Sequence, residues 1–310
     1  MLISVIIPHL NQEDHLRTGL EALHAQTNVT AGVEIIVVDN GSTRLPELVC
    51  SAWPDVRLVS ERIPGPGPAR NRGIVEARGD ILAFIDADCR ADPGWIAAIE
   101  AAFANPRTRI IGGDVRVGYE NAAHPTFLEP YESIYSYRNN EHIAEGFSGT
   151  GNLATLPSVA AKVGPFAGIE VAEDRDWGLR ARATGYAIQY VPEMIVFHPA
   201  RKTFAELTRK WDRHIAHDYE RVRSRPLAGL RWLGRAIAVA GSPVFEFRTL
   251  LSSPRVCGPY ERILAFLCLT RIRLYRGGRM IGVLLRGDEL AVSNAWNRET
   301  GTVKQDSRAR

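Results

Sequence analysis

The first half of this 310-residue chain alternates short apolar segments with amphipathic ones. The apolar segments are 3–8, 34–39, 56–60 and 81–86, and helical spacing of leucines follows the first of them. Strands that are apolar at nearly every position are buried on both faces, which is typical of parallel sheets covered by helices. The pattern therefore predicts an α/β fold with a mostly parallel central sheet and helices on both faces.

The pattern loosens after residue 105 but still predicts further elements. Residues 109–118 are expected to form a strand with a glycine bend, and 149–155 a strand that is preceded by glycines. Asp92 and Pro93 are a suitable N-cap and first-turn pair for a helix through about residue 104. Thr203 and Glu206 have the spacing of a capping box, which predicts the start of another helix.

Polar residues follow three of the predicted strands directly. They are His9 to Asn11 after the first strand, Asp39 to Ser42 after the second, and Asp86 and Asp88 after the fourth. Ligands of open parallel sheets bind beyond the carboxyl ends of the strands. We therefore expect the three clusters to converge on one ligand site.

Asp86 and Asp88 are separated only by Ala87, so their charges repel unless something neutralises them. Two such carboxylates can hold Mg²⁺ or Mn²⁺, which keeps other coordination positions for phosphates. A solvated loop with two surface acids is the plain alternative. The Asp-x-Asp motif of haloacid-dehalogenase-like phosphatases fits poorly, because Cys89 occupies its fourth position and the strand is the fourth one.

Other polar motifs are ambiguous when taken singly. Asp39 is suited to bind a base or a ribose, but it also belongs to an ordinary strand–helix turn. Residues 65–73, GPGPARNRG, match neither phosphate-loop pattern, so Arg70 and Arg72 would have to supply the positive charge. The acids at 173–176 suit a helix start, and a lone histidine such as His198 is more often structural.

Seven segments, in this order, resemble family 2 glycosyltransferases, which have the GT-A fold, a nucleotide-sugar donor and an inverting mechanism. The resemblance covers roughly residues 2–200. It rests on SVIIPHLNQEDHL, VVDNGST, GPGPARNRGI, ILAFIDADC, SGTGNLA, VAEDRDWGLRARATGY and FHP. Departures from the usual pattern are Arg44, Cys89 and Trp177.

The resemblance implies a role for each matching residue. Asp174 would be the catalytic base, and Mn²⁺ or Mg²⁺ would bind Asp88 and His198. The donor would be a nucleoside-diphosphate sugar, with a UDP-sugar expected, and the acceptor a sugar or a lipid-linked molecule of bacterial glycan, polysaccharide or glycolipid synthesis. The alternative is a catalytically silent nucleotide-sugar-binding or scaffold protein. The donor-binding residues would be Pro8, Asp39, Arg70 and Asp86; those on the sugar and acceptor side would be Gly151, Asn152, Glu173 and Trp177.

We expect a GT-A domain over residues 1–202, with a nucleotide-sugar half (1–105) and an acceptor half (106–202). A basic helical region over 203–290 and a disordered tail over 291–310 would follow. Residues 1–200 carry 16 basic and 25 acidic side chains, whereas 201–290 carry 18 and 8. Nucleic-acid binding is not expected.

The basic region mixes arginine with leucine, isoleucine, tryptophan and phenylalanine, but it has no run of about 20 apolar residues that could span a membrane. This composition suits helices on an anionic membrane surface. Packing on the catalytic domain or homodimer formation would equally explain it. Four cysteines without paired spacing and the absence of a signal-peptide pattern favour the cytoplasm, with possible peripheral attachment to the inner face of the cell membrane.

Overall fold

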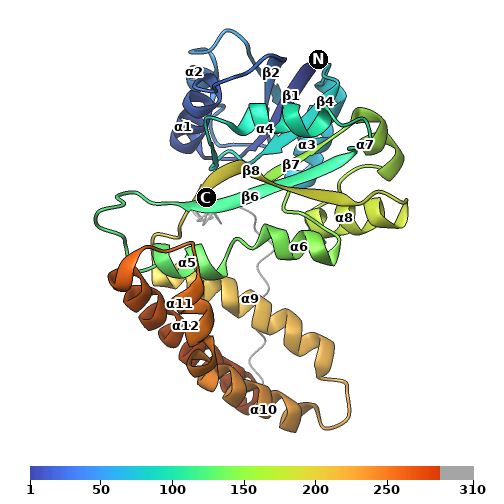
Figure 1. Ribbon diagram of the computed structural model, residues 1–310. Helices are drawn as coiled ribbons and strands as arrows, with labels where there is room; N and C mark the ends of the chain where they lie inside the picture. Colours follow the sequence, from blue (N-terminus) through green and yellow to red (C-terminus); the bar gives the residue numbers. More distant parts are fainter. Residues whose placement is uncertain (287–310) are drawn as a thin grey trace, which may run out of the picture.

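The computed structural model describes residues 1–286, and the tail predicted to be disordered lies outside them. An eight-stranded sheet in the order β3-β2-β1-β4-β7-β6-β8-β5 forms its centre (Figure 1). The strands are β1 (Leu2–His9), β2 (Gly32–Asp39), β3 (Val56–Ser60), β4 (Ile81–Ile85), β5 (Arg90–Ala91), β6 (Ile110–Gly118), β7 (Asn152–Thr155) and β8 (Ile188–Pro199).

The first four strands form a parallel unit, as their continuous apolar runs predicted. β1 pairs with β2 and β4, and β2 pairs with β3, all in parallel. Successive residues of β1 enter opposite cores, with Val5 and Ile7 in one and Ile6 in the other. Because His9 lies opposite Asp39 in this register, the polar ends of β1 and β2 meet.

The rest of the sheet is mixed. β7 is antiparallel to both β4 and β6, β5 is antiparallel to β8, and β6 runs parallel to β8. The register of β6 shifts between Gly113 and Asp114, which is the irregularity expected from its glycines. The α/β class is confirmed, with antiparallel pairing confined to the part beyond β4.

Helices cover both faces of the sheet. One core lies between the sheet and α1, α2 and α4, and the other lies between the sheet and α3, α7 and α8. The bounds are α1 (Glu13–His24), α2 (Glu47–Cys50), α3 (Pro66–Glu76), α4 (Trp95–Phe103), α7 (Pro157–Val163) and α8 (Glu173–Ala183).

The fourth helix begins later than the sequence predicted. Asp92 accepts a hydrogen bond from the Gly94 N–H at 3.0 Å and so forms a turn before the helix. The helix starts at Trp95, and the Gln26 side chain accepts the Ile96 N–H at 2.9 Å. A residue distant in sequence has taken over the capping, which a local pattern cannot reveal.

The C-terminal helices form an arm that extends below the sheet in Figure 1. The arm begins at the predicted capping box, where Thr203 Oγ1 accepts the Glu206 N–H at 3.3 Å. Arg255 of the arm pairs with Asp114 of β6. Its elements are α9 (Phe204–Val222), α10 (Ala228–Gly241), η1 (Ser242–Glu246), α11 (Phe247–Ser252) and α12 (Gly258–Arg286). Helix α12 packs against α5 (Glu129–Tyr135), and α6 (Asn139–Glu145) packs against β6 and β8.

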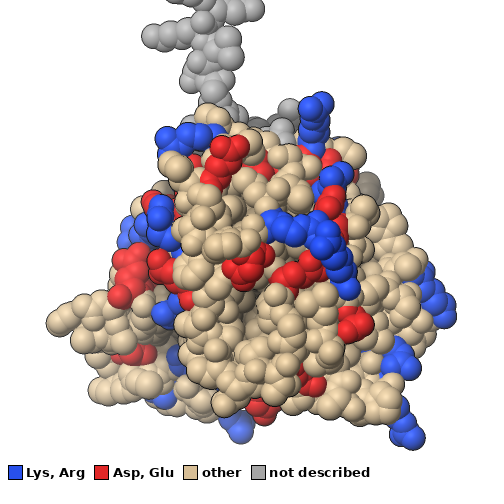
Figure 2. Space-filling model, turned by 90° about the horizontal axis from the view of Figure 1, so that it is seen from above, with Lys and Arg blue, Asp and Glu red and all other residues tan. Residues whose placement is uncertain are grey.

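At the end away from the arm, acidic and basic side chains lie next to one another (Figure 2). Within residues 1–286, none of the helices combines the length and the apolar character that crossing a membrane takes.

Candidate active site

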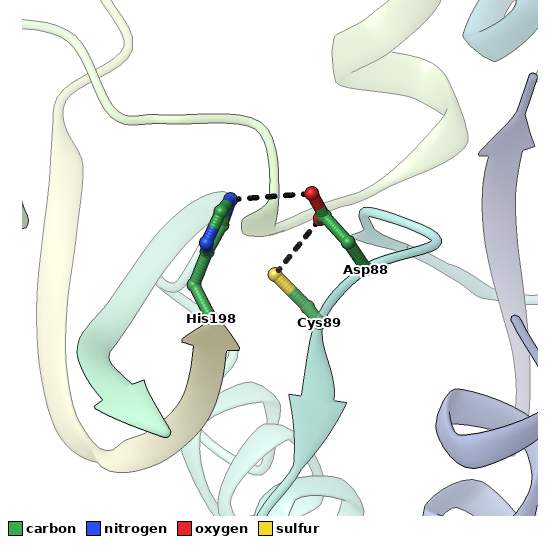
Figure 3. Close-up of side chains that lie close together, drawn as sticks. All are labelled: Asp88, Cys89 and His198. Atoms are coloured by element: carbon green, nitrogen blue, oxygen red, sulfur yellow. Dashed lines mark hydrogen bonds and ion pairs between the residues drawn. The ribbon is translucent and has the colours of Figure 1, made fainter. Parts of the chain in front are cut away.

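The end of β4 brings Asp88 to the end of β8, as the resemblance implied. Asp88 Oδ2 lies 3.5 Å from His198 Nε2, and Asp88 Oδ1 lies 3.9 Å from Cys89 Sγ (Figure 3). One potential ligand atom from each of the three residues lies within 4.8 Å of the others. Asp88 and His198 are 110 positions apart in sequence, so only the fold brings them together.

The hydrogen bonds of His198 fit a metal ligand. Its Nδ1 lies 2.8 Å from the carbonyl oxygen of Pro199 and 2.9 Å from the Tyr137 hydroxyl. A carbonyl oxygen can only accept, so Nδ1 carries the proton and Nε2 presents its lone pair toward Asp88. A histidine held through its second nitrogen in this way is the usual arrangement at metal sites.

Cys89 is a neighbour of this pair and a poor partner for Mg²⁺ or Mn²⁺. Burial, and then the charges of Asp88 and Asp86, raise the pKa of its thiol well above the usual value. Hard divalent cations prefer oxygen ligands and accept imidazole, so Asp88 and His198 are the suitable pair.

The end of β1 and β2 forms a second polar cluster. Asp39 Oδ1 lies 3.0 Å from His9 Nδ1, and Asp39 Oδ2 accepts the N–H groups of Gly41 and Ser42, each at 3.1 Å. Burial raises the pKa of Asp39, but the hydrogen bonds from His9 and Ser42 outweigh it, so the net pKa is lowered. Asp39 is therefore an ionised carboxylate that fixes the turn after β2.

His9 is a site residue to which the sequence assigned no role. It is fully buried, and its Nε2 accepts the Gln12 N–H at 3.2 Å, which leaves Nδ1 as the donor to Asp39. Pro8 is buried beside it in β1, opposite Val38. The only sequence signal for His9 was its place among the polar residues after the first strand.

Arg70 links the two acidic motifs. Its Nη2 donates to Asp86 Oδ1 at 2.7 Å, and its Nη1 donates to Glu173 Oε1 at 2.8 Å. The side chain is 2% exposed, and its Nε has no hydrogen-bond partner among the described residues. The motif that begins α8 therefore lies directly across Arg70 from the motif that ends β4.

The glycines and prolines before Arg70 explain how it reaches this position. Gly65 has a φ of +124°, which favours glycine, and Pro66 begins α3. A Cβ on Gly67 would lie 2.0 Å from the carbonyl oxygen of Ala167. The GPGP segment thus lets α3 approach the chain before α8, and it does not form a phosphate cradle.

Asp174 lies in the first turn of α8, next to Glu173. Burial, and then the charge of Glu173, raise the pKa of Asp174 above its usual value. Its Oδ1 accepts the Arg175 N–H at 2.7 Å. A carboxylate with a raised pKa is better matched to proton abstraction from a hydroxyl group than an ordinary aspartate.

Gly151 lies close to the Asp86 carboxylate. A Cβ at this position would lie 2.5 Å from Asp86 Oδ2, the carboxylate that Arg70 holds. The residue has no side chain with which to bind a sugar, but it lets β7 approach Asp86.

Gly151→Ala is expected to displace the Asp86 carboxylate and weaken binding of a nucleotide sugar roughly tenfold, as for the loss of one charged hydrogen bond. Titration calorimetry would measure the dissociation constant. Gly234→Ala is the matched control, because nothing lies within 4 Å of its Cβ. Equal affinity in the two variants would contradict the proposed contact.

Asn152 and Trp177 correct two sequence predictions. Asn152 is fully buried; it donates to the carbonyl oxygens of Asp114 and Met194 and accepts the Trp95 Nε1–H, each at 2.8 Å. Trp177 is 1% exposed and donates to the carbonyl oxygen of Gly164 at 3.0 Å. Neither side chain can touch an acceptor in this conformation, so we assign both to packing.

A hollow of about 210 Å³ opens beside Asp88. It is bordered by α1, by the end of β6 and by the end of β8. Cys89 also lines it, and the other lining residues, to which the sequence assigned no role, include His15, Thr18, Tyr119, Glu120 and Phe197.

Two solved structures with a similar fold were determined in complex with nucleotide sugars. A mannosyltransferase from Pyrobaculum calidifontis, PcManGT, in complex with GDP-Man and Mn²⁺, is 19% identical, with a TM-score of 0.55, covering 96% of this chain and 88% of that one. S. aureus TarS 1–349 in complex with UDP-GlcNAc is 14% identical, with a TM-score of 0.51, covering 95% and 90%. These likenesses show the GT-A glycosyltransferase fold.

Sequence relatives agree with the fold. The glycosyltransferase AglE of Haloferax volcanii is 32% identical over 215 residues, which is 67% of this chain and 70% of AglE. The uncharacterized glycosyltransferase YibD of Escherichia coli is 40% identical over 95 residues, 29% of this chain and 27% of YibD. Fold, site and relatives define a glycosyltransferase. The family model described as Glycosyl transferase family 2 matches residues 4–174, and the chain belongs to that family.

Proposed function

We propose that this glycosyltransferase moves a sugar from a nucleoside-diphosphate sugar to an acceptor hydroxyl by metal-assisted single displacement with inversion. The observation that carries the proposal is the Arg70 bridge, which joins Asp86 of one acidic motif to Glu173 of the other at 2.7 Å and 2.8 Å. The two motifs therefore serve one site from different sides. Inversion requires such a division, with the departing diphosphate on one side and the base on the other.

Each residue has a distinct task in this mechanism. Asp174 accepts the proton of the attacking hydroxyl, and Glu173 holds the start of α8 against Arg70. Asp88 and His198 would hold the metal. Mn²⁺ or Mg²⁺, when bound, supplies positive charge that stabilises the departing diphosphate. Asp39 and His9 shape the turn on the nucleotide side, where Pro8, Arg70 and Asp86 are also placed.

We propose the donor from the ligands of the similar solved structures and from the residues of the site. PcManGT is solved with GDP-Man and TarS with UDP-GlcNAc, so we retain the nucleoside diphosphate as the common part and a UDP-sugar as the first candidate. Thermal shift of the full chain with a panel of UDP- and GDP-sugars tests this. A donor at 100 times its dissociation constant stabilises the fold by about 2.7 kcal/mol. EDTA is expected to abolish the shift.

A silent nucleotide-sugar-binding protein is the competing function. It would show the same Mn²⁺-dependent thermal shift but would release no nucleoside diphosphate over time. Asp88, His198 and Asp174 are all in place, which favours the enzyme. Lack of turnover with every donor that binds would favour the silent alternative.

We further infer that the arm contacts an anionic membrane surface. Apolar side chains are exposed along α10, η1 and α12, among arginines that include the exposed Arg231. The strongly exposed ones include Leu230, Ile237, Val244, Phe245, Ile263 and Leu274. Such a surface suits the interface of a bilayer and would let the enzyme reach a lipid-linked acceptor. A homodimer through the same face is the alternative.

Phe245→Ser is expected to weaken binding to vesicles of phosphatidylcholine and phosphatidylglycerol about tenfold or more, because burial of a phenylalanine contributes about 1.5–3 kcal/mol. Phe245 is 86% exposed, so the change should leave the fold intact. Leu48→Ser on α2 is the control, since Leu48 is 82% exposed but remote from the arm. Co-sedimentation would measure binding. A concentration-dependent dimer without vesicle binding would contradict the membrane contact.

A further inference from the structure

Positive side chains gather around Trp211 where α9 meets α5 and α12. The guanidinium carbon of Arg276, on α12, lies 3.5 Å from the centroid of the Trp211 ring. Lys210 Nζ lies 5.8 Å from the centroid of the same ring. Tyr135 of α5 packs in the same hydrophobic cluster as Trp211. The three helices lie together beneath the sheet (Figure 1).

Three other arginines of the arm are paired with acids. Arg273 pairs with Glu246, Arg279 with Asp212 and Arg235 with Asp218. Among residues 1–286, no acid forms an ion pair with Lys210 or Arg276. A half-buried charge without a counter-charge is unfavourable.

The uncompensated charge has a consequence for both side chains. Burial, and then the charge of Arg201, lower the pKa of Lys210 to about 8. Burial, and then the charge of Arg273, lower the pKa of Arg276 to about 10. The charge of Glu132 raises the pKa of Lys210, but Glu132 is already paired with Arg201. An anion in this cluster would relieve both cations.

The same cluster contains hydrogen-bond donors without acceptors. Arg276 Nε, Trp211 Nε1 and the Tyr135 hydroxyl are buried and have no hydrogen-bond partner in the part of the chain that the structure describes. The arginine and tryptophan groups can only donate. Unmatched donors and unmatched positive charges therefore occur together, and both would be satisfied by an acceptor that carries negative charge.

We propose that this cluster of Lys210, Trp211, Arg276 and Tyr135 binds a phosphate group. The donors come from three helices, α5, α9 and α12, and the several oxygens of a phosphate can accept from more than one of them. Arginine and lysine are the usual phosphate partners in proteins.

The position of the cluster assigns the phosphate to the acceptor, and this part rests on the proposed function. Tyr137 follows Tyr135 by two residues, and its hydroxyl lies 2.9 Å from Nδ1 of the metal-site residue His198. The end of α5 thus has one tyrosine at the metal site and the other in the cationic cluster. An acceptor with a phosphate near its reactive hydroxyl would span the two.

Titration calorimetry with inorganic phosphate, on the full chain in EDTA, tests the site. Wild type is expected to bind phosphate, and Lys210→Met to bind it about tenfold or more weakly. Arg231→Met is the matched control; it also removes one positive charge from the arm, but from an exposed side chain outside the cluster. Lys210→Arg should retain binding, which guards against a folding defect. Equal affinity in wild type and Lys210→Met would overturn the site.

Two further experiments distinguish this site from other phosphate-binding sites. Asp88→Asn should retain phosphate binding; its loss there, with Lys210→Met unaffected, would place the phosphate at the donor site and overturn the proposal. Vesicles of phosphatidylcholine, with and without phosphatidic acid, test the bilayer as the source. A Lys210 effect seen only with phosphatidic acid would overturn the acceptor assignment. If phosphate bound at Lys210 while no nucleotide sugar bound anywhere, the site would stand and the proposed function would fail.

Discussion

Asp174→Asn is expected to lower kcat by about 10²–10⁴-fold and to leave donor binding unchanged, because it removes only the general base. An asparagine keeps the size of the side chain and its hydrogen bond with the Arg175 N–H, which Asp174 accepts at 2.7 Å. The measurement is release of nucleoside diphosphate under saturating donor and Mn²⁺, alongside the dissociation constant of the donor.

Asp176→Asn is the matched control on the same helix turn. Asp176 pairs with Arg180 at 2.8 Å across a partly exposed surface, where ion pairs contribute little. This variant should change kcat less than about threefold. Equal losses in the two variants would mean that the charge at the start of α8 matters, and not Asp174 as a base.

The pH dependence follows from the raised pKa of Asp174, which burial and then Glu173 cause. A base acts when deprotonated, so kcat should fall as pH falls through a value above 3.8, the usual one for aspartate. The raised pKa also means that the protonated form favours the folded state, so Asp174 lowers stability as pH rises through it. Asp174→Asn should therefore not lower the melting temperature at neutral pH.

Asp88→Asn is the change with the second-largest expected effect. It removes a carboxylate that lies 3.5 Å from His198 Nε2 and leaves the histidine as the remaining proposed ligand. Mn²⁺ affinity should fall at least about 100-fold. Replacing a residue that only hydrogen-bonds to a metal ligand already lowers metal affinity by up to about 100-fold, and Asp88 is proposed as a direct ligand. Mn²⁺ titration, with and without donor, measures this directly.

Asp92→Asn is the control for Asp88→Asn. Asp92 lies four residues further along the same segment and only accepts the Gly94 N–H at 3.0 Å. Its replacement should leave Mn²⁺ affinity unchanged. A metal affinity that survives Asp88→Asn would move the metal site elsewhere in the protein.

The parallel half of the sheet was predictable because most positions of β1, β2 and β4 are apolar and buried. The antiparallel placement of β7 was not, since GTGNLAT has no feature that fixes strand direction. The late start of α4 at Trp95 depends on Gln26, a cap supplied from 70 residues away. Local patterns indicate which segments form elements, but their partners come from the tertiary fold.

Some contacts of the candidate site were predictable from the order of the motifs along the chain. Asp88 and His198 meet as expected, and Arg70 contacts Asp86. The contact of Arg70 with Glu173 was not foreseen, because no pattern relates residues that are 103 positions apart. Asn152 and Trp177 lie in motifs that flank a site, and a motif does not reveal which of its side chains turn inward.

The most direct test of the account is the anomeric configuration of the transferred sugar. The full chain would be incubated with Mn²⁺ and the donor that stabilises it most, with simple alkyl glycosides as acceptor probes. Proton NMR would then give the coupling at the new anomeric centre. Metal-assisted inverting transfer predicts the configuration opposite to that of the donor bond, and no product in EDTA. A product with the donor's configuration, or one formed equally well without metal, would contradict it.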